Sequence, residues 1–100
     1  MEKQTTIAKE VSLTGIGLHT GKEVTLTYKP APANHGYVFK RIDLEGQPEI
    51  KALAENVIDT SRGTTIGTKD YHVSTIEHAL SALVGLQVDN VLIEVNGEEV

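Results

Sequence analysis

The pair Glu77-His78 holds two side chains whose chemistry could be coupled. A neutral imidazole is a common metal ligand, and a carboxylate beside it could take a proton from water at that metal, as in metal-assisted hydrolysis. A catalytic zinc ion takes three protein ligands. None of the other three histidines has helical ligand spacing to His78: His19, His35 and His72. From the residues alone, this metal site is therefore incomplete.

Residues 74–85 must position this pair, and their pattern predicts a helix. Ser74 could cap the first turn, and Glu77, three residues later, would complete a capping box. Gly85 stands where a helix commonly ends in a left-handed residue. Four apolar residues follow the spacing of one buried stripe: Ile76, Leu80, Leu83 and Val84.

His78 is predicted to lie about 200° around the helix from Ile76, because each residue turns the helix by ~100°. Its neighbours on that face, Ser81 and Ala82, are small, so another group could approach closely. Two structural alternatives stay open. A lone helical histidine is more often structural or merely exposed, and Glu77 could serve only as a capping residue.

Length and composition limit the classes of protein that this sequence can encode. One hundred residues suit one domain with a real core. The formal net charge of -5 argues against a nucleic-acid partner, because phosphate binding needs a basic surface. No apolar run approaches the ~20 residues of a membrane span, residues 1–6 form no apolar signal region, and cysteine is absent. The cytoplasm is the expected location.

Alternating apolar residues predict strands around this helix. Residues 37–42 are expected to pair back on residues 22–29 as a hairpin. Glycine-rich residues 15–21 are predicted to form a hairpin loop, residues 49–57 to be extended or irregular, and residues 59–67 to lead into a short strand. Five segments have strand patterns: 6–13, 22–29, 37–42, 71–73 and 88–95.

The arrangement of these elements predicts an α+β fold. Mostly antiparallel strands with helices packed on one face make a two-layer sandwich, and we predict this architecture for residues 1–100 as one domain. Asn96-Gly97 is a strong turn signal that should lead into another element, yet only three residues follow it. The sequence is therefore expected to be a fragment of a longer protein.

Several motifs together resemble the N-terminal domain of the zinc-dependent UDP-3-O-acyl-N-acetylglucosamine deacetylases. The resemblance implies an amide hydrolase that performs the committed step of lipid A synthesis in Gram-negative bacteria. It also implies two similar α+β domains, each a sheet with two helices on one face, and an active site between them. The motifs cover essentially the whole chain in order: Gly15-Ile16-Gly17-Leu18-His19-Thr20-Gly21, Pro30-Ala31-Pro32-Ala33-Asn34, and Ser74-Thr75-Ile76-Glu77-His78 through Asp89-Asn90.

The resemblance further implies roles for individual residues. His78 matches the family's first zinc ligand, whereas the other two ligands, a histidine and an aspartate, belong to the second domain and are absent here. Glu77 matches the general base that activates the water at the zinc ion. His19 matches a histidine of the active-site region whose role is left open. The loop Ser61-Arg62-Gly63-Thr64 matches a segment that borders the substrate, and it supplies three more candidate contacts: Ser61, Arg62 and Gly63.

This chain departs from the family pattern in that loop. Some members carry a cysteine where this chain has Gly63, so any metal contact from that position is lost. The polar Ser61-Arg62 pair replaces apolar versions. In some bacteria the deacetylase is fused to a hydroxyacyl carrier-protein dehydratase, and these residues do not reveal whether the parent chain has that extension. The expected partners are the UDP-sugar substrate and the second domain of the parent chain.

Two other classes of function compete with the enzyme fragment. A free-standing, non-catalytic interaction module would present an exposed apolar patch and tolerate substitution at both Glu77 and His78. A nucleic-acid module is an alternative because two-layer folds of this kind occur in RNA-associated proteins. The acidic balance and the lack of basic and aromatic clusters oppose that alternative.

Overall fold

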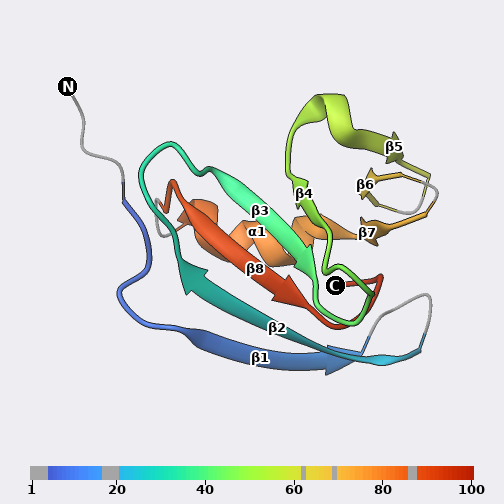
Figure 1. The fold of residues 1–100 in the computed structure, drawn as a ribbon, viewed down its shortest axis with the longest axis horizontal. Helices are drawn as coiled ribbons and strands as arrows, with labels where there is room; N and C mark the ends of the chain where they lie inside the picture. The colour runs from blue at the N-terminus through green and yellow to red at the C-terminus, as the bar shows by residue number, and fades with distance from the viewer. Residues whose placement is uncertain (1–4, 17–20, 62, 69, 86–87) are drawn as a thin grey trace.

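The computed structural model describes residues 5–16, 21–61, 63–68, 70–85 and 88–100, and for residues 78, 82, 84 and 85 it describes the backbone alone. These residues form two β-sheets and one α-helix (Figure 1), which confirms the predicted α+β class with a predominance of sheet. The elements follow in this order: β1 (Val11–Ile16), β2 (Glu23–Pro30), β3 (Tyr37–Arg41), β4 (Glu49–Lys51), a 3-10 turn η1 (Ala54–Asn56), β5 (Val57–Asp59), β6 (Thr65–Gly67), β7 (His72–Ser74), α1 (Ile76–Gly85) and β8 (Val91–Val95).

Strand β8 occupies the centre of the larger sheet, whose order is β1-β2-β8-β3-β4. It runs antiparallel to β2 and parallel to β3. The predicted hairpin of residues 22–29 and 37–42 is therefore wrong, since β8 separates β2 from β3 and β3 pairs with β4 instead. Burial supplies the physical reason. Val91, Ile93 and Val95 are fully buried, so β8 removes most apolar surface from water when it lies inside the sheet.

Strands β1 and β2 form the antiparallel hairpin that was predicted around the glycine-rich segment. Residues 17–20 of that segment lie outside the described part of the chain. Strand β1 begins at Val11, five residues later than predicted from residue 6. Thr6 forms an isolated parallel bridge with Asn90 instead, so the beginning of the described chain pairs with the segment just before β8.

The smaller sheet, of order β5-β6-β7, confirms the short strands predicted before the helix. Arg41 at the end of β3 connects the two sheets. Its guanidinium donates to both carboxylate oxygens of Asp43, at 2.9 and 2.8 Å, and to the carbonyl of His72 in β7 at 2.7 Å. The hydrogen bond from Arg41 lowers the pKa of the Asp43 carboxyl, although partial burial of the carboxyl opposes this shift. Such two-pronged pairs have a fixed geometry, so β7 is held beside the end of β3.

One hydrophobic core joins α1 to both sheets. In Figure 1, α1 lies behind the larger sheet, and the hydroxyl of Tyr28 in β2 donates to the carbonyl of Ala79 in α1 at 3.0 Å. Burial also raises the pKa of the Tyr28 phenol. The core takes side chains from the larger sheet, the smaller sheet and α1: Phe39, Ile50, Val91, Ile93, Val95, Ile66, Val73, Ile76, Ala79 and Leu83.

Helix α1 has the apolar stripe and the end that were predicted. Ile76 and Leu83 are buried and Leu80 is partly buried, while the side chain of Val84 lies outside the description. The helix ends at Gly85, and the N–H of Val88 donates back to the carbonyl of Leu83 at 3.0 Å. The layering of more than one helix on one sheet face stays a prediction. No helix within the described residues is long and apolar enough to cross a membrane.

Gly67 at the end of β6 offers a test of the smaller sheet. Its φ is +119°, and a Cβ atom there would lie 2.5 Å from the carbonyl oxygen of Tyr71 and 2.9 Å from Cα of His72. Because these are backbone atoms, the strand pair itself would have to move. We expect Gly67→Ala to lower the free energy of unfolding by about 2 kcal/mol or more, since overpacking and positive φ each cost about 1–3 kcal/mol.

Urea unfolding monitored by circular dichroism measures this difference, and Gly15→Ala is the matched control. A Cβ atom at Gly15 would meet nothing within 4 Å, so its stability should stay the same or rise by up to about 1 kcal/mol. Equal losses in the two variants would contradict the close approach of β6 and β7 at Gly67.

Candidate functional site

The helix that carries Glu77 begins at Ile76, two residues later than predicted. Ser74 is the last residue of β7, and its N–H donates to the carbonyl of Glu98 at 2.6 Å. Its hydroxyl accepts a hydrogen bond from the hydroxyl of Thr65 across the β6–β7 pair at 3.2 Å. Ser74 is therefore engaged in strand pairing, and the predicted capping box of Ser74 and Glu77 is wrong.

Thr75 joins β7 to α1 in a left-handed backbone conformation, with a φ of +61°. This conformation is a real outlier for a β-branched residue, so neighbouring contacts must hold it. Thr75 is buried, and its hydroxyl donates to Oε2 of the buried Glu99 at 3.5 Å. The N–H of Val100 donates to the carbonyl of Ser74 at 3.1 Å. The segment after β8 thus helps to fix the direction in which α1 leaves β7.

The carboxylate of Glu77 lies at an exposed position in the first turn of α1, against Thr64 in the loop before β6. The N–H of Thr64 donates to both carboxylate oxygens, at 3.0 Å to Oε1 and 2.9 Å to Oε2, and the Thr64 hydroxyl donates to Oε2 at 2.9 Å. The carbonyl of Thr64 accepts a bond from the N–H of Ile76 at 3.3 Å. An exposed carboxylate in a defined orientation can accept a proton from water.

Gly63 brings the neighbouring loop close to this carboxylate. Its φ is +98°, and a Cβ atom there would lie 3.5 Å from Oε1 of Glu77 and 3.5 Å from Cα of Thr75. Glycine adopts such a left-handed conformation without steric cost. The structure therefore places Gly63, a predicted substrate contact, next to Glu77, the predicted base.

The other predicted site residues are less completely described. Ser61 is exposed, and its N–H donates to Oδ1 of Asp59 at 2.9 Å. Arg62 and His19 lie outside the described residues. The backbone of His78 lies in the first turn of α1, and its side chain is outside the description. The roles of these four residues stay predictions.

The predicted zinc site can be compared with the donors that the structure describes. Among those residues, no group of three or more histidine, cysteine, aspartate or glutamate side chains could hold a metal ion. An imidazole at position 78, next to an exposed carboxylate at position 77, is a donor set that suits one edge of a metal site. The site stays a prediction that needs ligands from outside this set.

Two residues that shape the site were named within motifs but were given no role of their own from the sequence. Thr64 lies 13 residues before Glu77, and no periodic pattern connects two positions in separate elements. Thr75 has a β-branched side chain, which disfavours positive φ, so no local rule predicts its conformation. The only signal for Thr64 was its place in the loop at residues 61–64.

Comparison with known proteins identifies relatives along the whole chain. A family model described as UDP-3-O-acyl N-acetylglycosamine deacetylase (LpxC) matches residues 4–100. The chain is 58% identical over 96 residues to the bifunctional enzyme LpxC/FabZ of Chlorobaculum tepidum. The aligned region makes up 96% of this chain and 21% of that protein. The chain is also 50% identical over 100 residues to the UDP-3-O-acyl-N-acetylglucosamine deacetylase of Teredinibacter turnerae. The aligned region makes up 100% of this chain and 33% of that protein.

A third relative, the UDP-3-O-acyl-N-acetylglucosamine deacetylase of Myxococcus xanthus, is 50% identical over 97 residues, 97% of this chain and 31% of that protein. The chain thus spans about a fifth to a third of the length of the curated relatives it matches.

We expect the 100-residue chain by itself to lack a tight one-to-one zinc site. One predicted ligand out of about three cannot hold the ion in a catalytic geometry, so zinc should bind only loosely to the four histidines. Calorimetric titration with zinc measures this. His78→Ala and the control His35→Ala should change the weak binding to a similar small extent. A submicromolar site that disappears in His78→Ala would mean that these residues already contain the full ligand set.

Proposed function

The chain belongs to the UDP-3-O-acyl N-acetylglycosamine deacetylase family, and we propose on this basis that it forms the N-terminal part of an enzyme that removes the N-acetyl group from UDP-3-O-acyl-N-acetylglucosamine. The structural observation that supports the proposal most directly is the exposed Glu77 carboxylate, which Thr64 holds in the first turn of α1. This is the position that the family resemblance gives to the general base.

Glu77 acts as the general base in the proposed amide hydrolysis. A water molecule attacks the acetyl carbonyl carbon, and a new C–O bond forms while Glu77 takes a proton from that water. The amide C–N bond then breaks as the leaving nitrogen takes up the proton that Glu77 accepted, which yields acetic acid, ionised to acetate at neutral pH, and the free amine of the sugar. Because Glu77 is exposed, both the water and the acetyl group can reach its carboxylate. Gly63, beside Oε1 of Glu77, leaves room for the substrate on that side.

His78 supplies one of three zinc ligands in this proposal, and a histidine and an aspartate of a second domain in the parent chain supply the others. When bound, a zinc ion would polarise the acetyl carbonyl and make the attacking water more acidic. The second domain is therefore the expected partner of this chain, and the 100 residues alone should be inactive. We assign His19, Ser61, Arg62 and Gly63 to substrate contact.

The proposed reaction is the committed step of lipid A biosynthesis, in the cytoplasm of a Gram-negative bacterium. Both single-function deacetylases and bifunctional LpxC/FabZ proteins occur among the relatives. Either arrangement is compatible with these residues for the parent of this chain.

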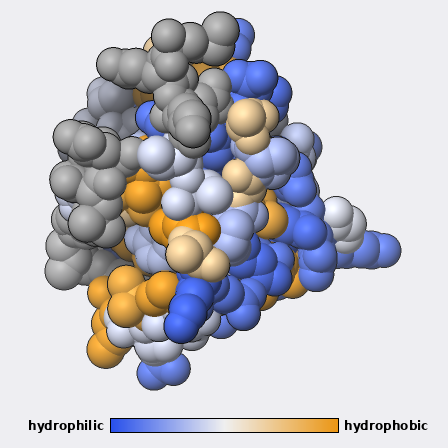
Figure 2. Space-filling model, turned by 90° about the vertical axis from the view of Figure 1, so that its left-hand side faces the viewer, coloured by the Kyte–Doolittle hydropathy of each residue, from blue (hydrophilic) through white to orange (hydrophobic). Residues whose placement is uncertain are grey.

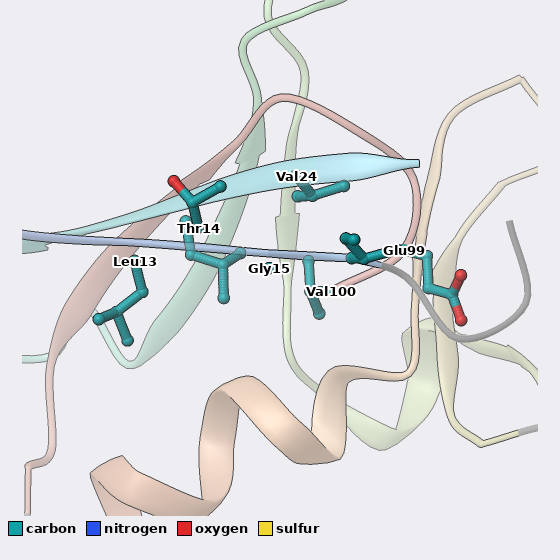
Figure 3. A pocket seen from close by; sticks show the side chains of 8 residues that line it. Leu13, Thr14, Gly15, Val24, Glu99 and Val100 are labelled. Carbon is teal, nitrogen blue, oxygen red and sulfur yellow. The ribbon is translucent and has the colours of Figure 1, made fainter. Parts of the chain in front are cut away.

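The described residues leave one face of the larger sheet uncovered at its β1 edge. Val11 and Leu13 of β1, two residues apart and so on the same face of the strand, are 48% and 56% exposed. In Figure 2, a side view in which β1 keeps its place at the bottom, apolar surface gathers at the lower left. Figure 3 shows the side chain of Leu13 on the side of β1 where α1 lies, whereas the side chain of Thr14 is on the opposite side. The uncovered face is thus the one on which α1 also lies.

A groove of about 230 Å³ runs along this face, between β1, β2 and the segment after β8. Leu13, Ile16, Val24, Leu26 and Val100 contribute its apolar lining. We assign the groove to a second helix of the parent chain, which would complete the layer of helices on one side of the sheet. The extra length of the relatives supports this occupant over an unrelated partner protein.

The division of roles between Glu77 and His78 can be tested in the full-length parent enzyme. Glu77→Gln should retain zinc and thermal stability and lower kcat by about 10²–10⁴-fold, the usual contribution of general base catalysis. His78→Ala should lower both the zinc content and kcat. Metal analysis, the thermal midpoint Tm and steady-state kinetics on the same preparations provide the comparison. If kcat survives in Glu77→Gln, the base lies elsewhere.

The uncovered sheet face should make the 100-residue chain associate with itself, because large exposed apolar patches are prone to contact. Sedimentation velocity across a concentration series measures this association. Leu13→Lys should reduce it, whereas Ile58→Lys is the control, since Ile58 is 50% exposed on β5 and outside the groove. A chain that stays monomeric at the highest concentration would argue against an unfilled docking face.

A further inference from the structure

We propose that Thr64 is a positioning residue for the catalytic carboxylate, and that its hydroxyl sets the orientation in which Glu77 meets the attacking water. This inference rests on the proposed function, because it assigns Thr64 a part in the same proton transfer. It goes beyond that function by giving a catalytic consequence to a residue that touches neither the predicted metal nor, in the proposed mechanism, the reacting atoms.

The contact geometry defines the carboxylate plane. The Thr64 N–H donates to Oε1 and Oε2 at 3.0 and 2.9 Å, and the hydroxyl adds a second bond to Oε2 at 2.9 Å. Hydrogen bonds to a charged acceptor are stronger than those between neutral groups. A glutamate side chain at an exposed position otherwise has several rotatable bonds free. Donors to both oxygens therefore restrict how the carboxylate turns.

Strand pairing in turn restricts Thr64. Thr65 pairs with Ser74 and Ile66 pairs with Val73 in the antiparallel β6–β7 register. The carbonyl of Thr64 also accepts the N–H of Ile76 at 3.3 Å. The loop residue is thereby fixed to the same backbone that leads into α1, so the carboxylate and its donors move as one unit. Position matters for catalysis, because a misplacement of about 1 Å can lower the rate by about 10²-fold.

The two tasks of Thr64 are carried by different atoms. Its backbone carbonyl satisfies a free N–H at the start of the helix, while its hydroxyl contacts only the carboxylate among the bonds that the structure describes. Replacing the side chain therefore leaves the backbone bonds to Ile76 and Glu77 in place. This separation makes a structural role and a positioning role distinguishable by experiment.

The test uses the full-length parent enzyme. Thr64→Val keeps the branched shape and removes the hydroxyl. It should lower kcat by about 10–100-fold, the usual effect of losing a residue that orients a site, with KM and zinc content unchanged and Tm within about 4 °C of the parent. Thr64→Ser restores the hydroxyl and should recover kcat to within about threefold. Thr65→Val is the matched control, because the Thr65 hydroxyl bonds Ser74 and not Glu77.

If Thr64→Val does not fold, Thr64→Ala takes its place in the same comparison. A kcat loss in Thr64→Val no larger than that in Thr65→Val would overturn the proposal, and so would a loss that Thr64→Ser does not recover. A combined Thr64→Val and Glu77→Gln variant supplies the last arm. If Thr64 acts through Glu77, the double variant should be no slower than Glu77→Gln alone; a further loss close to that of Thr64→Val would also overturn the proposal.

The outcomes keep this inference separate from the proposed function. Full activity in Glu77→Gln would reject the assignment of Glu77 as the general base, and with it the proposed mechanism. A large loss in Glu77→Gln together with a neutral Thr64→Val would leave the proposed function intact and reject the positioning role of Thr64.

Discussion

Strand β8 must lie between β2 and β3 before either of those strands has two neighbours in the sheet. Its inward side chains Val91, Ile93 and Val95 are fully buried, so the larger sheet depends on the burial of a strand that follows all its other strands in the described sequence. These pairings join residues far apart in sequence, such as Leu26 with Val95. Bringing such distant residues together costs chain entropy, and this cost arises before the contacts between the strands can stabilise the sheet. The free energy gained when the apolar side chains of β8 are buried therefore stabilises the larger sheet as a whole.

The candidate site depends on the same strand. The residues that follow β8 turn at Asn96 and run beside β7, where Glu98 and Val100 exchange backbone hydrogen bonds with Ser74. This pairing lies directly before Thr75, whose φ of +61° sets the direction of α1. Strain at one residue can persist when its surroundings determine its conformation. The position of Glu77 thus follows from the central strand, through the segment after it.

The smaller sheet completes the arrangement from the other side. Arg41 holds β7 through the carbonyl of His72, and the β6–β7 pair places Thr64 against the first turn of α1. Two separate sheets therefore converge on one helix start. The exposed apolar surface at the β1 edge lies on the same face of the larger sheet as α1, beyond the part that α1 covers.

The sequence by itself determined the local elements, because periodicity and turn residues act over short distances. The alternation in residues 22–29, the stripe of Ile76, Leu80 and Leu83, and the position of Glu77 and His78 on one helix were all evident before the structure. The α+β class followed from them, and motif resemblance supplied the family. The resemblance also implied that residues 61–64 form a loop bordering the site.

Only the tertiary structure decided what those elements meet. A hairpin between β2 and β3 is the local choice, and it loses to β8 because Val91, Ile93 and Val95 of β8 become fully buried at the centre of the sheet. A capping box at Ser74 is likewise the local choice, and it loses because Ser74 is already paired with Glu98. The contact of Thr64 with Glu77 joins two elements across 13 residues. Such a contact depends on strand register, which the sequence pattern of either element does not contain.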